Sequence, residues 1–338
     1  ADALASENYL RGGTEDAASR LLYEAELQAV NSGLVTLGNR VPAAQAQRLA
    51  EVSGQLGEYA GLVEQARANN RQGYPVGAAY LRTANSAAAQ MTTVLREVQA
   101  ALRQQVNAAL DRADTAGMWL HLVGWPLLLL LAVGGGWVAF RFRRLLNVPL
   151  AAALLLTLLV VVVGGTMQGG SLADAESATA GPLQAADLAS QARVAAFDAH
   201  TQESLALINR GNADESMWSA ASDVVGLALA QLCGRSDQCD LQSSYDQYGR
   251  THLQVRELDD SGDWDAAREL SLGDGSEAFA SFASDSSDVA QAFTSSAVSE
   301  LSGSASGLGG LRAVVFIAGL VVAALAVAGF GQRLREYR

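Results

Sequence analysis

The sequence contains no lysine, only five prolines among 338 residues, and few aromatic side chains, which make up 6% of the chain. Because proline interrupts helices, so few of them leave long stretches free to be helical. Half of the residues are apolar, mostly alanine, leucine and valine. This composition is typical of helices and lipid-facing segments rather than of a β-sandwich. We therefore predict an all-α protein.

Basic side chains are scarce relative to acidic ones. The chain has 23 basic residues, all arginine, against 35 aspartates and glutamates, and its net charge is −12. A nucleic-acid-binding protein needs a basic face, so this balance argues against that function.

Motifs for catalysis or metal binding are also missing. His121, His200 and His252 are the only histidines, and no further ligand lies at metal spacing from two of them. There is no phosphate-binding glycine loop, nucleophile elbow or kinase signature set. The acidic turn at 259–265 lacks the glutamate that closes a calcium loop. We expect no enzymatic activity, no metal and no cofactor.

Charge is absent from three long apolar runs, Trp119–Phe140, Pro149–Met167 and Ala313–Gly331. Each is long enough to cross a bilayer as a helix, and a buried core helix would seldom stay uncharged for so long. We predict three transmembrane helices in contact with membrane lipid. His121 is the one ionisable side chain in a span; it is either functional or snorkels to the interface beside Trp119.

Arginines flank the spans on one side. Arg141, Arg143 and Arg144 lie between the first two runs, and Arg333 and Arg335 follow the third. Short arginine-rich segments face the cytoplasm by the positive-inside rule. These five arginines are therefore candidates for coupling to cytoplasmic partners.

This orientation divides the chain into alternating external and internal segments. Because residue 1 would lie outside, we also expect a further span upstream of it. The predicted order is an external helical domain at 1–117, a span at 118–140, a cytoplasmic basic turn at 141–148, a span at 149–168, an acidic external helical domain at 169–311, a span at 312–331 and a cytoplasmic tail at 332–338.

Cys233 and Cys239 are the only cysteines, and both fall in the external acidic segment. An oxidising compartment favours a disulfide between them. Two thiols without a nearby histidine or second pair make a poor metal site, and their spacing is not that of a redox C-x-x-C motif. We predict a structural disulfide.

The two external segments share the frame Y-x5-Q-x-R-x5-G-x4-A-x2-L, which begins at Tyr59 and again at Tyr248. We interpret this as an internal repeat of helical bundles. Its glycines, Gly73 and Gly262, are expected to end helices in the left-handed conformation. Expected helices cover about 15–37, 42–69 and 76 onward in the first segment, and about 173–208, 214–232, 241–258 and 264 onward in the second.

The repeat also aligns Tyr59 with Tyr248 and Arg67 with Arg256, eight residues apart on one helix face in each copy. One interpretation is a ligand or partner surface, since arginine suits a carboxylate. The other is that the tyrosine packs in the bundle and the arginine pairs with a neighbouring acid.

The phrases YAGLVEQARANNRQGYPVGAAYLR and VRELDDSGDWDAA, the repeated domain-and-hairpin plan and the ending RLREYR resemble the GlnX-type membrane proteins of actinobacteria. The resemblance implies a four-span sensor with two external helical domains. It further implies that an amino-acid-binding lipoprotein delivers an aspartate- or glutamate-type signal outside, and that a soluble Ser/Thr protein kinase receives it inside.

Large external segments and very short internal ones favour signal relay over the alternatives. A transporter would need more polar groups within its spans than His121. A structural or accessory subunit of a larger membrane complex is the second interpretation, with the acidic segment as its docking surface. The oligomeric state is left open, with a homo-oligomer as one option.

Overall fold

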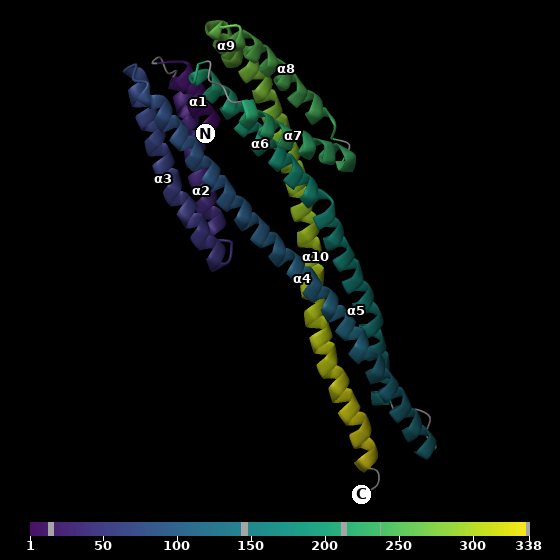
Figure 1. The fold of residues 1–338 in the computed structure, drawn as a ribbon. Coiled ribbons are helices and arrows are strands. Elements are labelled where there is room, and N and C mark those ends of the chain that lie inside the picture. The colour runs from purple at the N-terminus through teal and green to yellow at the C-terminus, as the bar shows by residue number, and fades with distance from the viewer. Residues whose placement is uncertain (13–16, 143–147, 211–214, 237, 336–338) are drawn as a thin grey trace. The chain divides into compact units, whose positions relative to one another are not determined.

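The computed structural model describes residues 1–12, 17–142, 148–210, 215–236 and 238–335. Helices account for the secondary structure of these ranges, and no strand occurs in them, which confirms the predicted all-α class. Figure 1 shows the elements, which are α1 (Asp2–Leu10), α2 (Ala17–Gly38), α3 (Ala43–Arg71), α4 (Val76–Phe142), α5 (Val148–Ala180), α6 (Pro182–Ile208), α7 (Glu215–Ser236), α8 (Asp240–Asp260), α9 (Trp264–Leu270), the π-helix η1 (Ser271–Gly275) and α10 (Ser276–Arg335).

The chain forms two compact units. Unit 1 comprises residues 1–103 and 184–293, and unit 2 comprises residues 104–183 and 294–338. Most of the residues predicted to be external, at 1–117 and 169–311, belong to unit 1. One contact that joins the two segments is a 2.6 Å interaction between Glu7 Oε1 and His200 Nε2.

Three clusters of buried side chains make the core of unit 1. The first joins α6, α7, α8 and α10 around Tyr248 and Phe282, and the second joins α1 to α4 around Tyr59 and Leu81. In the third, Leu10 of α1 packs with Leu207 of α6 and with side chains of α8 and α9. Helix α1 therefore contributes to the packing of both sequence segments.

Two turns of unit 1 depend on glycine. Gly73 follows α3 with φ +73°, and Gly262 follows α8 with φ +88°. These values lie in the left-handed region, where a glycine has no Cβ to clash. After the second turn, the Asp263 side chain accepts a hydrogen bond from the Ala266 amide and caps α9.

Cys233 and Cys239 form the predicted disulfide. Cys233 lies in the last turn of α7, and Cys239 directly precedes α8. The bond therefore links the end of α7 to the residue before α8.

The last helical region of unit 1 differs from the single helix expected from residue 264 onward. Five residues, Ser271–Gly275, adopt a π-helical turn between α9 and α10. A π-turn inserts an extra residue into the helix and changes which side chains face the core. Here it directs Ser271 to the buried carboxylate of Glu203, which lies 2.7 Å from the serine hydroxyl.

Three helical segments are long and apolar enough to cross a membrane, which agrees with the three predicted spans. Within unit 2, α4 and α5 approach closely at glycines. The His121 ring lies against Gly165, and Gln168 lies against Gly117 and donates to the Ala113 carbonyl at 2.6 Å. A small residue at a helix crossing lets the two backbones come close together.

Candidate functional site

A buried carboxylate–histidine pair lies between α6 and α8. Glu203 Oε2 and His252 Nδ1 are 2.6 Å apart, and each side chain is 1% exposed. Ser271 donates to Glu203 Oε1 at 2.7 Å, and Tyr248 donates to Oε2 at 3.3 Å. Burial alone would raise the pKa of Glu203, but these hydrogen bonds and the nearby imidazoles hold it below its usual value.

A second pair connects α1 to α6. Glu7 Oε1 lies 2.6 Å from His200 Nε2 and accepts a hydrogen bond from Ser276 of α10 at 3.1 Å. Burial raises the pKa of Glu7, but the contacts with His200 and Ser276 outweigh this effect, so its pKa lies below the usual value. His200 Nδ1 is 3.4 Å from the Tyr248 hydroxyl, so this tyrosine lies between the two pairs.

Aromatic rings cover both histidines. Phe279 stacks on His200 with ring centroids 4.1 Å apart, and Trp218 stacks on His252 at 3.7 Å. These rings exclude water from the imidazoles and raise the cost of leaving either carboxylate unpaired. We call Glu7, His200, Tyr248, Glu203 and His252 together the Glu–His network.

The structure places the four residues of the candidate binding surface in the interior or in ion pairs. Tyr59 is 2% exposed and donates to Asp2, and Tyr248 is fully buried in the Glu–His network. Arg67 pairs with Glu64 at 2.6 Å. Both tyrosine rings are therefore packed inside unit 1 as members of its core clusters.

Arg256 also lies in ion pairs, at the rim of the Glu–His network. Its guanidinium bridges Glu215 and Asp259, each at 2.6 Å, and Asp260 at 2.7 Å. Glu215 in turn lies 3.2 Å from His252 Nε2. This arginine therefore neutralises acids next to the buried pair.

The proposed cytoplasmic coupling residues are described only in part. Arg143 and Arg144 lie outside the described residues. For Arg141, Arg333 and Arg335 the backbone is helical, and their side chains also lie outside the description.

Sequence reasoning missed the Glu–His network because it searched the histidines for metal spacing. His200 and Glu203 are three residues apart, and Tyr248 and His252 are four apart, so each pair shares a helix face. Polar side chains at this spacing on two otherwise apolar helix faces could have predicted a buried polar network. Within the described part of the chain, no group of three or more metal-ligating side chains is placed to hold an ion.

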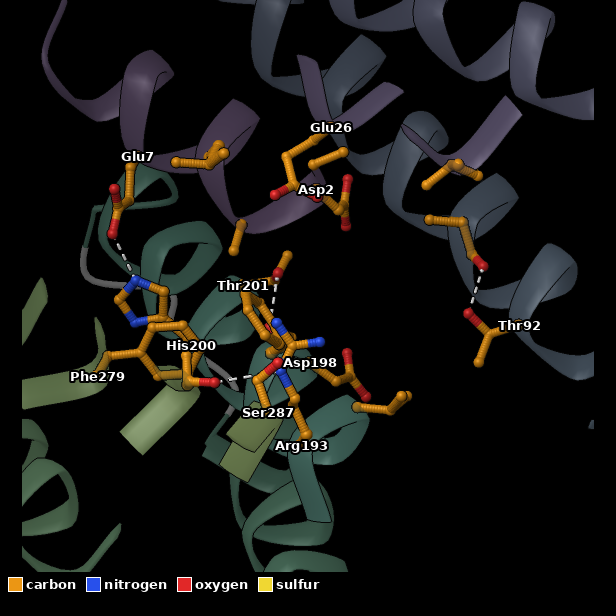
Figure 2. A pocket seen from close by; sticks show the side chains of 18 of the residues that line it. Asp2, Glu7, Glu26, Thr92, Arg193, Asp198, His200, Thr201, Phe279 and Ser287 are labelled. Carbon is orange, nitrogen blue, oxygen red and sulfur yellow. Dashed lines mark hydrogen bonds and ion pairs between the residues drawn. The ribbon is translucent and has the colours of Figure 1, made fainter. Parts of the chain in front are cut away.

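A cavity of about 840 Å³ opens beside the Glu7–His200 pair, among α1, α2, α4, α6 and α10 (Figure 2). Its volume is in the range of small-molecule sites. The charged side chains that line it are Asp2, Glu7, Glu26, Asp198, Asp288, Arg96 and Arg193.

The two sides of the cavity carry different groups. Asp2 accepts hydrogen bonds from Tyr59 at 3.1 Å and from Asn85 at 2.8 Å, and burial raises its pKa above the usual value. Arg193 lies with its guanidinium 5.0 Å from the centre of the Phe197 ring and donates to the Ala283 carbonyl. Whatever fills the cavity therefore contacts helices from both sequence segments.

Residues 1–115 match the family described as the actinobacterial sensor domain. This region contains α1, α2, α3 and the first part of α4. No curated protein and no solved structure matches the chain. The similarity supports an actinobacterial sensor protein with a sensing or signalling role.

Proposed function

We propose that this chain is a transmembrane relay that passes an external signal to a protein kinase inside the cell. The observation that carries the proposal is the continuity of α4 and α10. Each helix contributes residues to unit 1, which contains most of the matched sensor region, and each also contains an apolar segment long enough to cross a membrane. Both helices therefore continue without a break from the residues of unit 1 into an apolar segment.

The Glu–His network suggests how a signal reaches α10. Helix α1 contacts α10 through Glu7 and Ser276, and it contacts α6 through Glu7 and His200. A signal that changes the position of α1 therefore changes contacts at the start of α10. Because the two carboxylates are buried and depend on their hydrogen-bond partners, the network has few acceptable arrangements, which favours discrete states over gradual change.

The chemistry of the signal comes from the resemblance to GlnX-type proteins. On this basis we propose that an external amino-acid-binding lipoprotein, loaded with aspartate or glutamate, acts on the external part of the chain. A cytoplasmic Ser/Thr kinase then binds the basic turn 141–148 and the tail 332–338. We also propose, on the same basis, that the full protein has a fourth membrane span and that both predicted external segments lie outside the cell membrane.

The test replaces the arginines at the proposed cytoplasmic contact. We expect a chain with Arg141, Arg143, Arg144, Arg333 and Arg335 all changed to glutamine to reach the membrane but to lose the kinase response to external aspartate or glutamate. The readout is phosphorylation of the kinase target in intact cells. A matched control changes five arginines of unit 1, of which Arg20 is half-buried and the other four, Arg40, Arg48, Arg235 and Arg250, are exposed. An unchanged response in the first variant contradicts the proposal.

A further inference from the structure

Four arginines gather at one end of unit 1. Arg11 directly follows α1, Arg71 is the last residue of α3, Arg82 lies in the second turn of α4, and Arg210 lies just after α6. Figure 1 shows the ends of α1, α3 and α6 and the start of α4 at the same end of the unit.

Contacts between the helix ends hold this arrangement. Arg82 Nη1 donates to the Asn209 side chain at 2.6 Å, which joins the start of α4 to the end of α6. Asn70 donates to the Tyr9 carbonyl at 2.8 Å, which joins the end of α3 to α1. The arginines next to these residues are therefore held near one another. We call Arg11, Arg71, Arg82 and Arg210 the basic end.

The arginines of the basic end are exposed, and none of them makes a salt bridge with another described residue. Other arginines of unit 1, such as Arg103 and Arg256, pair with acids at 2.6 Å. In a chain with a net charge of −12, most arginines could find acidic neighbours. Four arginines without a salt bridge, of which Arg82 is hydrogen-bonded to Asn209 and Arg210 is stacked on Trp264, keep a positive charge that can attract an anionic group from outside.

Arg210 is held in an unusual conformation. Its φ is +43°, and no other non-glycine residue in the described ranges has a positive φ. Its guanidinium lies 4.0 Å from the centre of the Trp264 ring, whose indole nitrogen donates to the Leu207 carbonyl at 2.7 Å. Strained backbone that the surroundings hold in place is typical of functional sites, and the stacking fixes the orientation of the cation in advance.

We propose that the basic end is the docking surface for a protein partner with an acidic face. Arginine and aromatic side chains are enriched at the centres of protein interfaces, and Tyr74, 54% exposed, lies in the turn between Arg71 and Arg82. Guanidinium groups bind carboxylates through paired hydrogen bonds, so side-chain carboxylates are the chemistry that fits. This inference rests on the proposed function in one respect: the relay requires an external partner protein, and the basic end is the surface to which that partner binds.

The experiment uses the full chain in detergent and a fluorescent deca-glutamate peptide as the acidic probe. One variant changes Arg11, Arg71 and Arg82 to glutamate. The control variant also changes three arginines to glutamate, at Arg40, Arg235 and Arg250. These are exposed residues of unit 1, so the two variants have the same net charge. We expect the native chain to bind the peptide in a salt-sensitive way, the first variant to bind at least about tenfold more weakly, and the control to bind like the native chain.

Three outcomes overturn the inference. The native chain fails to bind the peptide, or both variants weaken equally, which would show that only net charge matters. The third outcome is that the basic end binds anionic lipid vesicles but not the peptide, which would indicate that it contacts a membrane surface instead.

The cellular response separates this inference from the relay itself. If the basic-end variant keeps a normal response to external amino acid and the cytoplasmic arginine variant loses it, the relay stands and the docking site is wrong. If the cytoplasmic variant responds normally but the basic-end variant loses peptide binding, the docking site stands and the relay is wrong.

Discussion

At the scale of single residues, unit 1 contains two glutamates that are buried together with their hydrogen-bond partners. Glu203 and His252 are each 1% exposed, and Glu7 and His200 form a second pair beside them. A buried carboxylate is tolerated only when hydrogen bonds and an opposite charge replace its water. We infer that the pairs favour one packing of α1, α6 and α8, because any other packing would leave a buried carboxylate without its partners.

Removing the charge of Glu203 tests this argument. We expect Glu203→Gln to lower the free energy of unfolding by about 1–3 kcal/mol, because the amide cannot accept from both His252 and Ser271 as the carboxylate does. Thermal unfolding of the full chain in detergent measures the change. Glu24→Gln is the matched control, since its ion pair with Arg20 is solvent-exposed and contributes about 0–1 kcal/mol. An equal loss in both variants would contradict a special role for the buried pair.

The same carboxylates predict how stability depends on pH. The pKa values of Glu7 and Glu203 are lower in the folded chain than the usual glutamate value of about 4.3. A lowered pKa contributes stability that is complete above the unfolded value and is lost as the pH falls through the folded value.

We therefore expect unfolding temperatures of the full chain to fall steeply as the pH drops below about 4.3. In a variant with both Glu7→Gln and Glu203→Gln, the unfolding temperature should depend less on pH in this range. If the unfolding temperature of the double variant depends on pH as that of the native chain does, then groups other than Glu7 and Glu203 titrate in this pH range.

Residue-level sequence reasoning succeeded where the signal was local. The disulfide of Cys233 and Cys239 was predicted from spacing and compartment. The roles of Tyr59 and Tyr248 were left open, since one sequence cannot tell a buried tyrosine from an exposed one on an alanine-rich helix. The pairing of Glu7 with His200 depends on a contact across 193 residues, which spacing along the chain does not reveal.

At the scale of elements, helix boundaries follow from caps and turn residues. The predicted helices at 42–69 and 241–258 correspond to α3 (Ala43–Arg71) and α8 (Asp240–Asp260). Each helix ends two residues before one of the glycines that the repeat aligned, Gly73 and Gly262. The π-turn η1 was not foreseen, because it is stabilised by tertiary contacts with Glu203 rather than by a local sequence pattern.

Those two glycines give a prediction at this scale. Gly73 and Gly262 have positive φ, and a Cβ at either would meet nothing within 4 Å. Alanine there should therefore destabilise the chain by about 1–2 kcal/mol through backbone strain alone. Gly57, inside α3 and also in open space, should instead gain about 0.5–1 kcal/mol as alanine. Thermal unfolding of the three variants checks both signs, and a loss at Gly57 as large as at Gly73 would contradict the assignment.

At the scale of the whole molecule, composition predicted the class and the three apolar helices, since long uncharged runs are unambiguous. Residues 1–103 and 184–293 form one compact unit, and this grouping could not be predicted from the sequence. Helix α1 packs against α6, α9 and α10 as well as against its own segment. A periodicity argument assigns each helix an apolar face but not the partner of that face.

In the proposed relay, this shared packing lets a signal pass from α1 to α10 through the Glu–His network. The most direct test is the amino-acid response of a Glu7→Gln chain, measured as phosphorylation of the kinase target in intact cells. The account predicts that the response to external aspartate or glutamate becomes constitutive or is lost, while the amount of protein in the membrane is preserved. A response of native size and amino-acid dependence in this variant would contradict it.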